Sequence, residues 1–353
     1  MDQTEALIIE TIDRHREEIL EFARDIYSHA ELGYKEFQTS GKFVKKMEQL
    51  GLRTEKGFAI TGVKAYLNED KKENASLALL GELDALRIPE HAFANPETNA
   101  AHCCGHHAQM AGVFGAALAL TVPEIAEKLD GQVVFFATPA EEYGEIEFKN
   151  QLREQGKIRY GGGKCELLRI GAFDDIDLCL THHIRPGNEI LVGSGTGNGF
   201  VSKVIRVLGK ASHAAGAPEK GVNALSAASL GLQALGLNRE TFRDEDCVRV
   251  HPIITKGGNL VNVIPDEVVV ETLVRGKTIE AFTDAAKKTD RSFKAGAIAM
   301  GAKVEISPLP GSLPTLAEEA LPELKHPAET RASGIPVIEG SAHAGATRAA
   351  GDA

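Results

Sequence analysis

The chain has 353 residues, of which 43% are apolar and 25% charged, and its net charge at pH 7 is -11. This length exceeds what one hydrophobic core usually supports, so we expect two domains. No apolar run reaches the roughly 20 residues of a membrane-spanning helix, and the acidic surface disfavours nucleic acid. The N-terminal sequence lacks the pattern of a secretory signal, which predicts a cytoplasmic protein.

The cysteines do not predict a disulfide framework. Their number is odd and they are scattered along the chain, at positions 103, 104, 165, 179 and 247. In a reducing compartment such cysteines are expected to be buried thiols or metal ligands.

Hydrophobic periodicity predicts the elements of the first half. Apolar residues at helical spacing predict one long amphipathic helix over residues 8–26 and a second over 36–50. Strand-like runs then alternate with helical patterns: VKAYL, SLALL, the helix AQMAGVFGAALAL, QVVFFAT and IDLCL. This order predicts an α/β fold with a mostly parallel sheet covered by helices.

A glycine-rich stretch near Val192, GSGTGNG, predicts a boundary. The next patterns are a strand, a helix, two strands, a helix and a strand, which is the ferredoxin-like βαββαβ order. We therefore expect a larger domain that begins with residues 1–195, an inserted small domain over 196–308, and a return to the larger domain over 309–353.

Metal-binding residue types follow the predicted strands. In open α/β sheets, ligands bind beyond the carboxyl ends of the strands. Each group alone has an ordinary explanation: a solvated acidic loop, a hydrogen-bonded histidine pair, or a buried cysteine. Their shared location favours a metal site. The residues are Glu82 and Asp84, Glu141 and Glu142, His182 and His183, and Cys104 and His106 at the start of a helix.

The mixture of ligands indicates the type of metal site. A structural zinc site would be closed by four Cys or His ligands, typically with CxxC spacing, and would leave the carboxylates unused. A redox CxxC motif is also absent from the sequence. Cysteine, histidine and glutamate around an open position favour hydrolysis, in which the metal activates water and a free carboxylate accepts its proton. Glu141 and Glu142 can divide the roles of base and ligand.

Several motifs, in order, resemble those of the M20 metallopeptidases, in the amidohydrolase branch with aminobenzoyl-glutamate, hippurate and auxin-conjugate hydrolases. The resemblance extends from HAELGYKEF to EISPLPGSLP. It is carried by GELDAL, CCGHHAQMAG, PAEEYG, HHIRP, GKASHAAGAPEKGVNAL and NLVNVIPDEVVVETLVR. It implies a zinc-peptidase-like catalytic domain with two divalent metals, zinc or manganese, and an inserted domain that acts as lid and homodimerisation module.

The resemblance also implies roles for individual residues. The matched metal ligands are Cys104, His106, Glu142 and His183. Glu141 matches the general base, and Asp84 matches a carboxylate that orients a ligand or the base. His213 matches a lid histidine that stabilises the oxyanion from the partner subunit. Asn262 and Arg275 match groups that hold the substrate's carboxylate.

Some positions depart from the family pattern. His107 replaces an aspartate, Gln109 replaces a frequent histidine, and Glu82 stands where relatives have Asp or His. Relatives supply a last histidine ligand from a C-terminal segment that this sequence lacks, so we expect a truncated or altered end. His343, in an Ala/Gly-rich tail expected to be poorly ordered from about Gly340, is the candidate replacement.

The function predicted from the sequence is hydrolysis of the amide bond between an acyl or aroyl group and an amino acid. The alternative is a non-catalytic, dimeric binding relative that has lost the last metal ligand.

Overall fold

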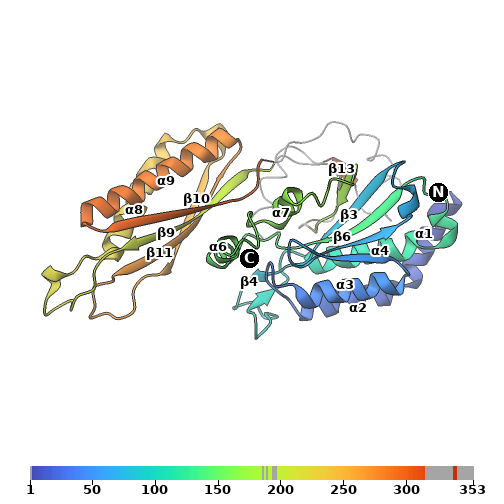
Figure 1. The fold of residues 1–353 in the computed structure, drawn as a ribbon, viewed down its shortest axis with the longest axis horizontal. Helices are drawn as coiled ribbons and strands as arrows, with labels where there is room; N and C mark the ends of the chain where they lie inside the picture. The colour runs from blue at the N-terminus through green and yellow to red at the C-terminus, as the bar shows by residue number, and fades with distance from the viewer. Residues whose placement is uncertain (1, 185–186, 188–189, 193–196, 315–336, 340–353) are drawn as a thin grey trace. The chain divides into compact units, whose positions relative to one another are not determined.

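The computed structural model describes residues 2–184, 187, 190–192, 197–314 and 337–339 (Figure 1). These residues form two compact units. Unit 1 contains residues 2–145 and 152–184, and unit 2 contains residues 146–151 and the described part of 187–339. The domain limits expected from the sequence stay predictions.

Unit 1 is built on a five-stranded sheet in the order β1-β2-β6-β3-β7. The strands are β1 (Arg53–Phe58), β2 (Gly62–Leu67), β3 (Ser76–Glu82), β6 (Gln132–Thr138) and β7 (Leu178–Thr181). β3 pairs in parallel with both β6 and β7, whereas β2 is antiparallel to β1 and β6. Four of these five strands therefore point the same way, which confirms the predicted mostly parallel sheet.

The helix α4 (His106–Leu120) forms the centre of the unit 1 core. It packs on β3 and also contacts α1 (Gln3–Arg14), α2 (Arg16–Ser28) and α3 (Phe37–Gln49). The close approach of α4 to β3 requires a glycine at position 81, because a Cβ there would lie 2.7 Å from Met110 Sδ. Gly81 thus lets α4, and with it His106, lie close against β3.

The N-terminal helix differs from its prediction. Instead of one helix over residues 8–26, two helices meet at His15, whose backbone (φ -96°, ψ 12°) leaves the helical region. The apolar spacing continues across the break, so the hydrophobic pattern alone does not show it. Other elements that the sequence analysis did not predict are β1, the 2-stranded sheet of β4 (Leu86–Arg87) and β5 (Ala100–Ala101), and the helices α5 (Pro123–Ala126), α6 (Ile146–Glu154) and α7 (Gly163–Arg169).

Unit 2 has the predicted βαββαβ order. Its elements are β9 (Gly199–Leu208), α8 (Ala224–Asn238), β10 (Arg249–Lys256), β11 (Glu267–Gly276), α9 (Ile279–Met300) and β12 (Lys303–Pro310). The antiparallel sheet has the order β10-β11-β9-β12, which is the ferredoxin-like arrangement.

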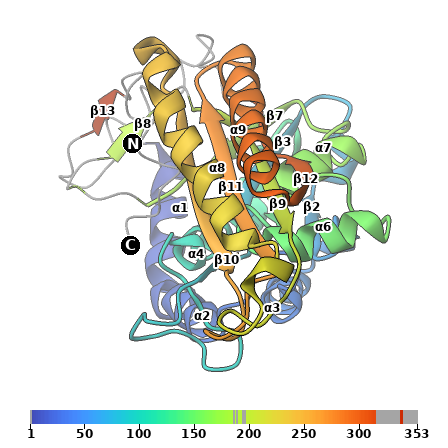
Figure 2. The same cartoon turned by 90° about the vertical axis from the view of Figure 1, so that its left-hand side faces the viewer.

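The two helices of unit 2 lie side by side against the sheet (Figure 2). Their contact depends on glycine, because a Cβ on Gly296 would lie 2.3 Å from the carbonyl oxygen of Ala227. The apolar core between helices and sheet includes Ile205 of β9, Val270 of β11 and Phe293 of α9, all fully buried.

A short parallel pair joins β8 (Ile190–Val192) to β13 (Val337–Glu339). The predicted replacement ligand His343 and the tail from Gly340 lie outside the described residues. Within the described part of the chain, no helix combines the length and apolarity needed to cross a bilayer.

Candidate metal centre

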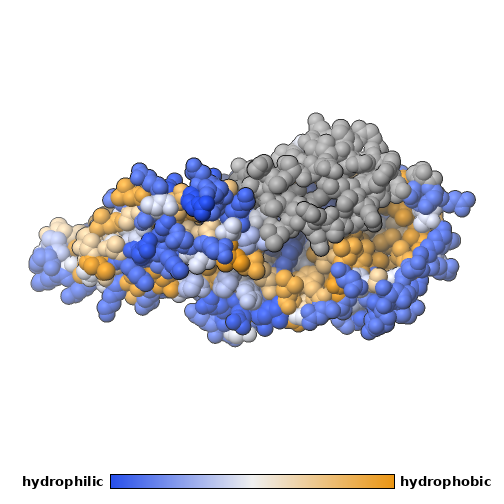
Figure 3. All heavy atoms as spheres, turned by 90° about the horizontal axis from the view of Figure 1, so that it is seen from above, coloured by the Kyte–Doolittle hydropathy of each residue, from blue (hydrophilic) through white to orange (hydrophobic). Residues whose placement is uncertain are grey.

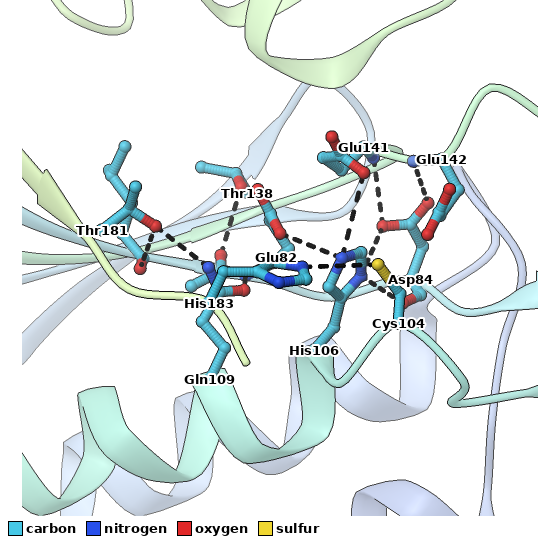
Figure 4. Close-up of polar contacts among 12 residues, drawn as sticks. Glu82, Asp84, Cys104, His106, Gln109, Thr138, Glu141, Glu142, Thr181 and His183 are labelled. Atoms are coloured by element: carbon cyan, nitrogen blue, oxygen red, sulfur yellow. Dashed lines mark hydrogen bonds and ion pairs between the residues drawn. The ribbon is translucent and has the colours of Figure 1, made fainter. Parts of the chain in front are cut away.

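Candidate metal-site residues of unit 1 meet at one edge of its sheet (Figure 4). Glu82 is the last residue of β3, Glu141 follows the end of β6, and His183 follows the end of β7. Because these three strands are parallel, their carboxyl ends lie together. His106, the first residue of α4, points into the same space from below the sheet edge.

Two overlapping sets of side chains could hold a metal ion. In the first set, donor atoms of Cys104, His106 and His183 lie within 4.8 Å of one another. The Cys104 Sγ and His183 Nε2 atoms are 3.3 Å apart. In the second set, donor atoms of Glu82, His106 and Glu141 lie equally close. His106 belongs to both.

The hydrogen bonds of the two histidines leave their Nε2 atoms available. His106 Nδ1 lies 2.7 Å from the carbonyl oxygen of Asp84, and His183 Nδ1 lies 2.7 Å from that of Ile184. A carbonyl oxygen only accepts, so in each ring Nδ1 carries the proton and Nε2 keeps its lone pair. The Nε2 atom of His106 is buried and makes no hydrogen bond with any described residue. This arrangement fits metal ligation by both rings.

Asp84 organises the loop that carries the two glutamates. Its side chain is fully buried and accepts hydrogen bonds from the backbone N–H groups of Glu141 (3.0 Å) and Glu142 (2.9 Å). One of its oxygens also lies 3.5 Å from His106 Nδ1. Asp84 therefore fixes the backbone of both glutamates; its role in orienting a ligand or a base stays a prediction.

The environments of the two glutamates favour proton transfer. Burial, together with the neighbouring Glu141 and Asp84 carboxylates, raises the pKa of Glu142 to about 7. Partial desolvation and the nearby Glu82 carboxylate also raise the pKa of Glu141, whose side chain is 39% exposed. Clustered carboxylates with raised pKa values are typical of sites that bind a cation or move a proton.

Two residues that the sequence analysis gave no role shape the site. Gln109, which is buried on α4, accepts a hydrogen bond from Glu82 N (2.9 Å) and donates to Thr181 Oγ1 (3.0 Å) and the His182 carbonyl oxygen (2.7 Å). It thus ties the ends of β3 and β7 to the helix. Lys164, on α7, donates a hydrogen bond to Glu82 Oε1.

The other departures from the family motif lie beside the centre. The His107 ring packs against Tyr27 and His102, with centroids 4.8 Å and 5.4 Å away. Burial and the nearby His107 lower the pKa of His102 to about 3, so it is neutral at physiological pH. Neither ring is in the two ligand sets.

Unit 2 carries the three predicted lid residues. His213 and Asn262 are neighbours, because the N–H of Ala214 donates to the carbonyl oxygen of Asn262 at 2.9 Å. His213 Nδ1 accepts from the N–H of Gly216 at 2.8 Å, so its exposed ring keeps the proton on Nε2 as a donor.

Arg275 lies elsewhere in unit 2. It stands near the end of β11, opposite Phe200, where the chain enters this unit. The strand from Glu267 to Arg275 spans about 26 Å at the usual rise per residue. The structure therefore groups His213 with Asn262 and separates both from Arg275.

Comparison with known proteins identifies the relatives of the chain. Residues 197–298 match the M20 peptidase dimerisation domain. An Xaa-Arg dipeptidase of Mus musculus is 29% identical over 304 residues, which cover 84% of this chain and 64% of that protein. This chain is a relative of the M20 metallopeptidases. One of the p-aminobenzoyl-glutamate hydrolase subunits of Escherichia coli is 27% identical and covers 83% of this chain.

Solved structures show the same fold. An aminobenzoyl-glutamate utilization protein from Klebsiella pneumoniae superposes with a TM-score of 0.71 at 19% identity, over 95% of this chain and 86% of that one. A dinuclear metal binding peptidase of the M20 family from Bacillus subtilis gives a TM-score of 0.60 at 22% identity, over 93% of this chain and 83% of that one. The chain spans less than two thirds of the length of these two curated relatives, with 64% of the mouse protein and 57% of the E. coli protein covered.

Proposed function

We propose that this M20 relative is a metal-dependent hydrolase that cleaves the amide bond between an acyl or aroyl group and an amino acid. The observation that carries the proposal is the meeting of Cys104, His106 and His183, with both Nε2 lone pairs available, beside Glu141. Relatives named for hydrolysis of aminobenzoyl-glutamate, IAA-amino acids and N-acetyl-L-cysteine support the substrate class.

The metal would be held by Cys104, His106, His183 and Glu142. When bound, a divalent ion polarises the substrate carbonyl and activates water for attack on it. Thiolate and imidazole ligands favour zinc, while the carboxylate also suits manganese. A cytoplasmic location remains a prediction from the sequence.

Glu141 would accept the proton of the attacking water and deliver it to the leaving amine. Its side chain is partly exposed, so it can meet a substrate, and its raised pKa brings it closer to the range in which one group both accepts and donates. Asp84 holds the backbone of Glu141 through a buried hydrogen bond and so limits the motion of this base.

Unit 2 would complete the site in a homodimer. His213 can donate from Nε2 to the oxyanion, next to Asn262, whereas Arg275 lies near the other end of β11, which spans about 26 Å from Glu267 to Arg275. We infer that His213 and Asn262 serve the partner's site, and that Arg275 holds the substrate carboxylate.

The edge strand β10 offers a pairing surface for the dimer. It lies at one end of the sheet order, and its Ile253 is 61% exposed. In Figure 3, hydrophobic residues interrupt the polar surface of unit 2, to the left.

The test is a panel of N-acyl and N-aroyl amino acids, assayed with the metal-free chain and after loading with zinc or manganese. Turnover is expected only with metal and only on amides with a free amino-acid carboxylate. Stoichiometric metal binding with no turnover on any member of the panel would contradict the proposal and favour a non-catalytic binding protein.

A further inference from the structure

Lys164 brings a positive charge into the metal centre. It lies on α7, and its Nζ donates a hydrogen bond to Glu82 Oε1. The Glu82 side chain is only 5% exposed, so this is a pair in which the carboxylate is buried. None of the motifs that mark the ligands contains Lys164.

Glu82 links this ammonium group to the second ligand set. Its other oxygen, Oε2, lies 3.0 Å from His106 Nε2, which in turn lies 3.9 Å from Glu141 Oε2. One donor of the second set is therefore a carboxylate that already pairs with a cation.

A divalent ion in the second set would lie beside the ammonium group, and the two positive charges would repel each other in a partly buried site. No lysine or arginine pairs, within the described ranges, with the donor atoms of the first set, Cys104, His106 and His183.

His106 also limits the number of metal ions that the centre can hold. Its Nδ1 is committed to the Asp84 carbonyl, so the ring offers one lone pair, on Nε2. A single lone pair can bind one ion, although both ligand sets include this ring. Because Lys164 pairs with Glu82, an ion bound to His106 Nε2 is held more favourably by the first set than by the second.

We propose that Lys164 takes the place of one metal ion, so that each chain binds a single divalent ion, which is held by Cys104, His106 and His183 together with Glu142. The Lys164 ammonium group, held by Glu82, places a positive charge near Glu141, where a second ion would otherwise lie. This inference rests on the proposed metal-dependent function, and it makes Lys164 a positioning residue.

The test counts metal ions rather than turnover. The metal-free full chain is titrated with Zn²⁺ by calorimetry, and the ions retained after gel filtration are measured by elemental analysis. The wild type is expected to bind one equivalent. Lys164→Met removes the charge and frees the Glu82 carboxylate, so its second equivalent should bind at least about 100-fold more tightly than in the wild type.

Two variants serve as controls. Lys164→Arg keeps the charge and should stay at one equivalent. Lys46→Met removes a lysine from another pair of unit 1, in which Nζ lies 2.8 Å from Glu18 Oε1, and should also stay at one. If Lys164→Met does not fold, as judged by circular dichroism, Lys164→Gln replaces it.

The outcomes separate this inference from the proposed function. Two equivalents of similar affinity in the wild type, or an unchanged count in a folded Lys164→Met or Lys164→Gln variant, would overturn the role of Lys164 and leave the hydrolase proposal intact. Absence of any bound metal in all variants would overturn both.

Discussion

Replacing Gln109 with leucine tests how the centre is held. The change keeps the approximate volume but removes three hydrogen bonds, and it leaves the buried N–H of Glu82 and the carbonyl oxygen of His182 without their partner. An unsatisfied buried group costs about 1–3 kcal/mol, so we expect the free energy of unfolding to fall by about 3 kcal/mol. For a domain of this size the melting temperature should fall by about 10 °C.

The same substitution should also weaken metal binding. Gln109 fixes the backbone of His182, next to the ligand His183, and partners of this kind typically contribute 10–100-fold to affinity. Urea unfolding of the metal-free protein and competition with a chelator measure the two effects. Gln49→Leu, at an exposed position on α3, is the matched control and should change the unfolding free energy by less than about 0.5 kcal/mol. Unchanged stability and affinity in Gln109→Leu would refute the role of this side chain.

Three further predictions follow from the same contacts. Burial opposes ionisation of Glu166, but Arg169 and two backbone N–H groups lower its pKa. Glu166→Gln should therefore destabilise the protein by about 2 kcal/mol at pH 7. Because the pKa of Glu166 is depressed in the folded state, the extra stability of the wild type is complete above the ordinary value of 4.5 and disappears as the pH falls through the lower folded value. Urea unfolding of both proteins from pH 7 to 3 measures this change. A difference in unfolding free energy that stays constant over this range would contradict the prediction. Cys104 should resist alkylation by iodoacetamide until a chelator is added, whereas Cys103 should react at the same rate with and without metal. Peptide mass spectrometry measures both reactions. Protection of both cysteines, or of neither, would contradict the assignment of Cys104 as a ligand. Mixing inactive Glu141→Gln with inactive His213→Ala subunits should restore about a quarter of wild-type turnover through heterodimers. A monomeric protein, or a mixture without activity, would contradict a site that takes His213 from the partner subunit.

The sequence predicted those parts of the molecule that local patterns determine. Strand-like apolar runs between helical patterns predicted β3, β6 and β7, and the parallel order of strands implied that Glu82, Glu141 and His183 would meet. The βαββαβ order of unit 2 was likewise visible in the periodicity.

Contacts between distant segments were not predictable in the same way. Lys164 reaches Glu82 across 82 positions, and Gln109 reaches His182 across 73. Both residues occupy ordinary helical positions, and nothing in the local sequence indicates which side chain they will meet. The break at His15 was missed because the apolar spacing continues through it.

The central claim is that Glu141 moves the proton in a metal-dependent hydrolysis. The most direct measurement compares the metal content and the turnover of Glu141→Gln with those of the wild type, on the best substrate of the N-acyl amino acid panel. Because Glu141 is the proposed base and not one of the four proposed ligands, the variant should keep its metal and lose at least about 100-fold in turnover. Loss of metal together with activity, or turnover close to the wild type with metal bound, would contradict the account.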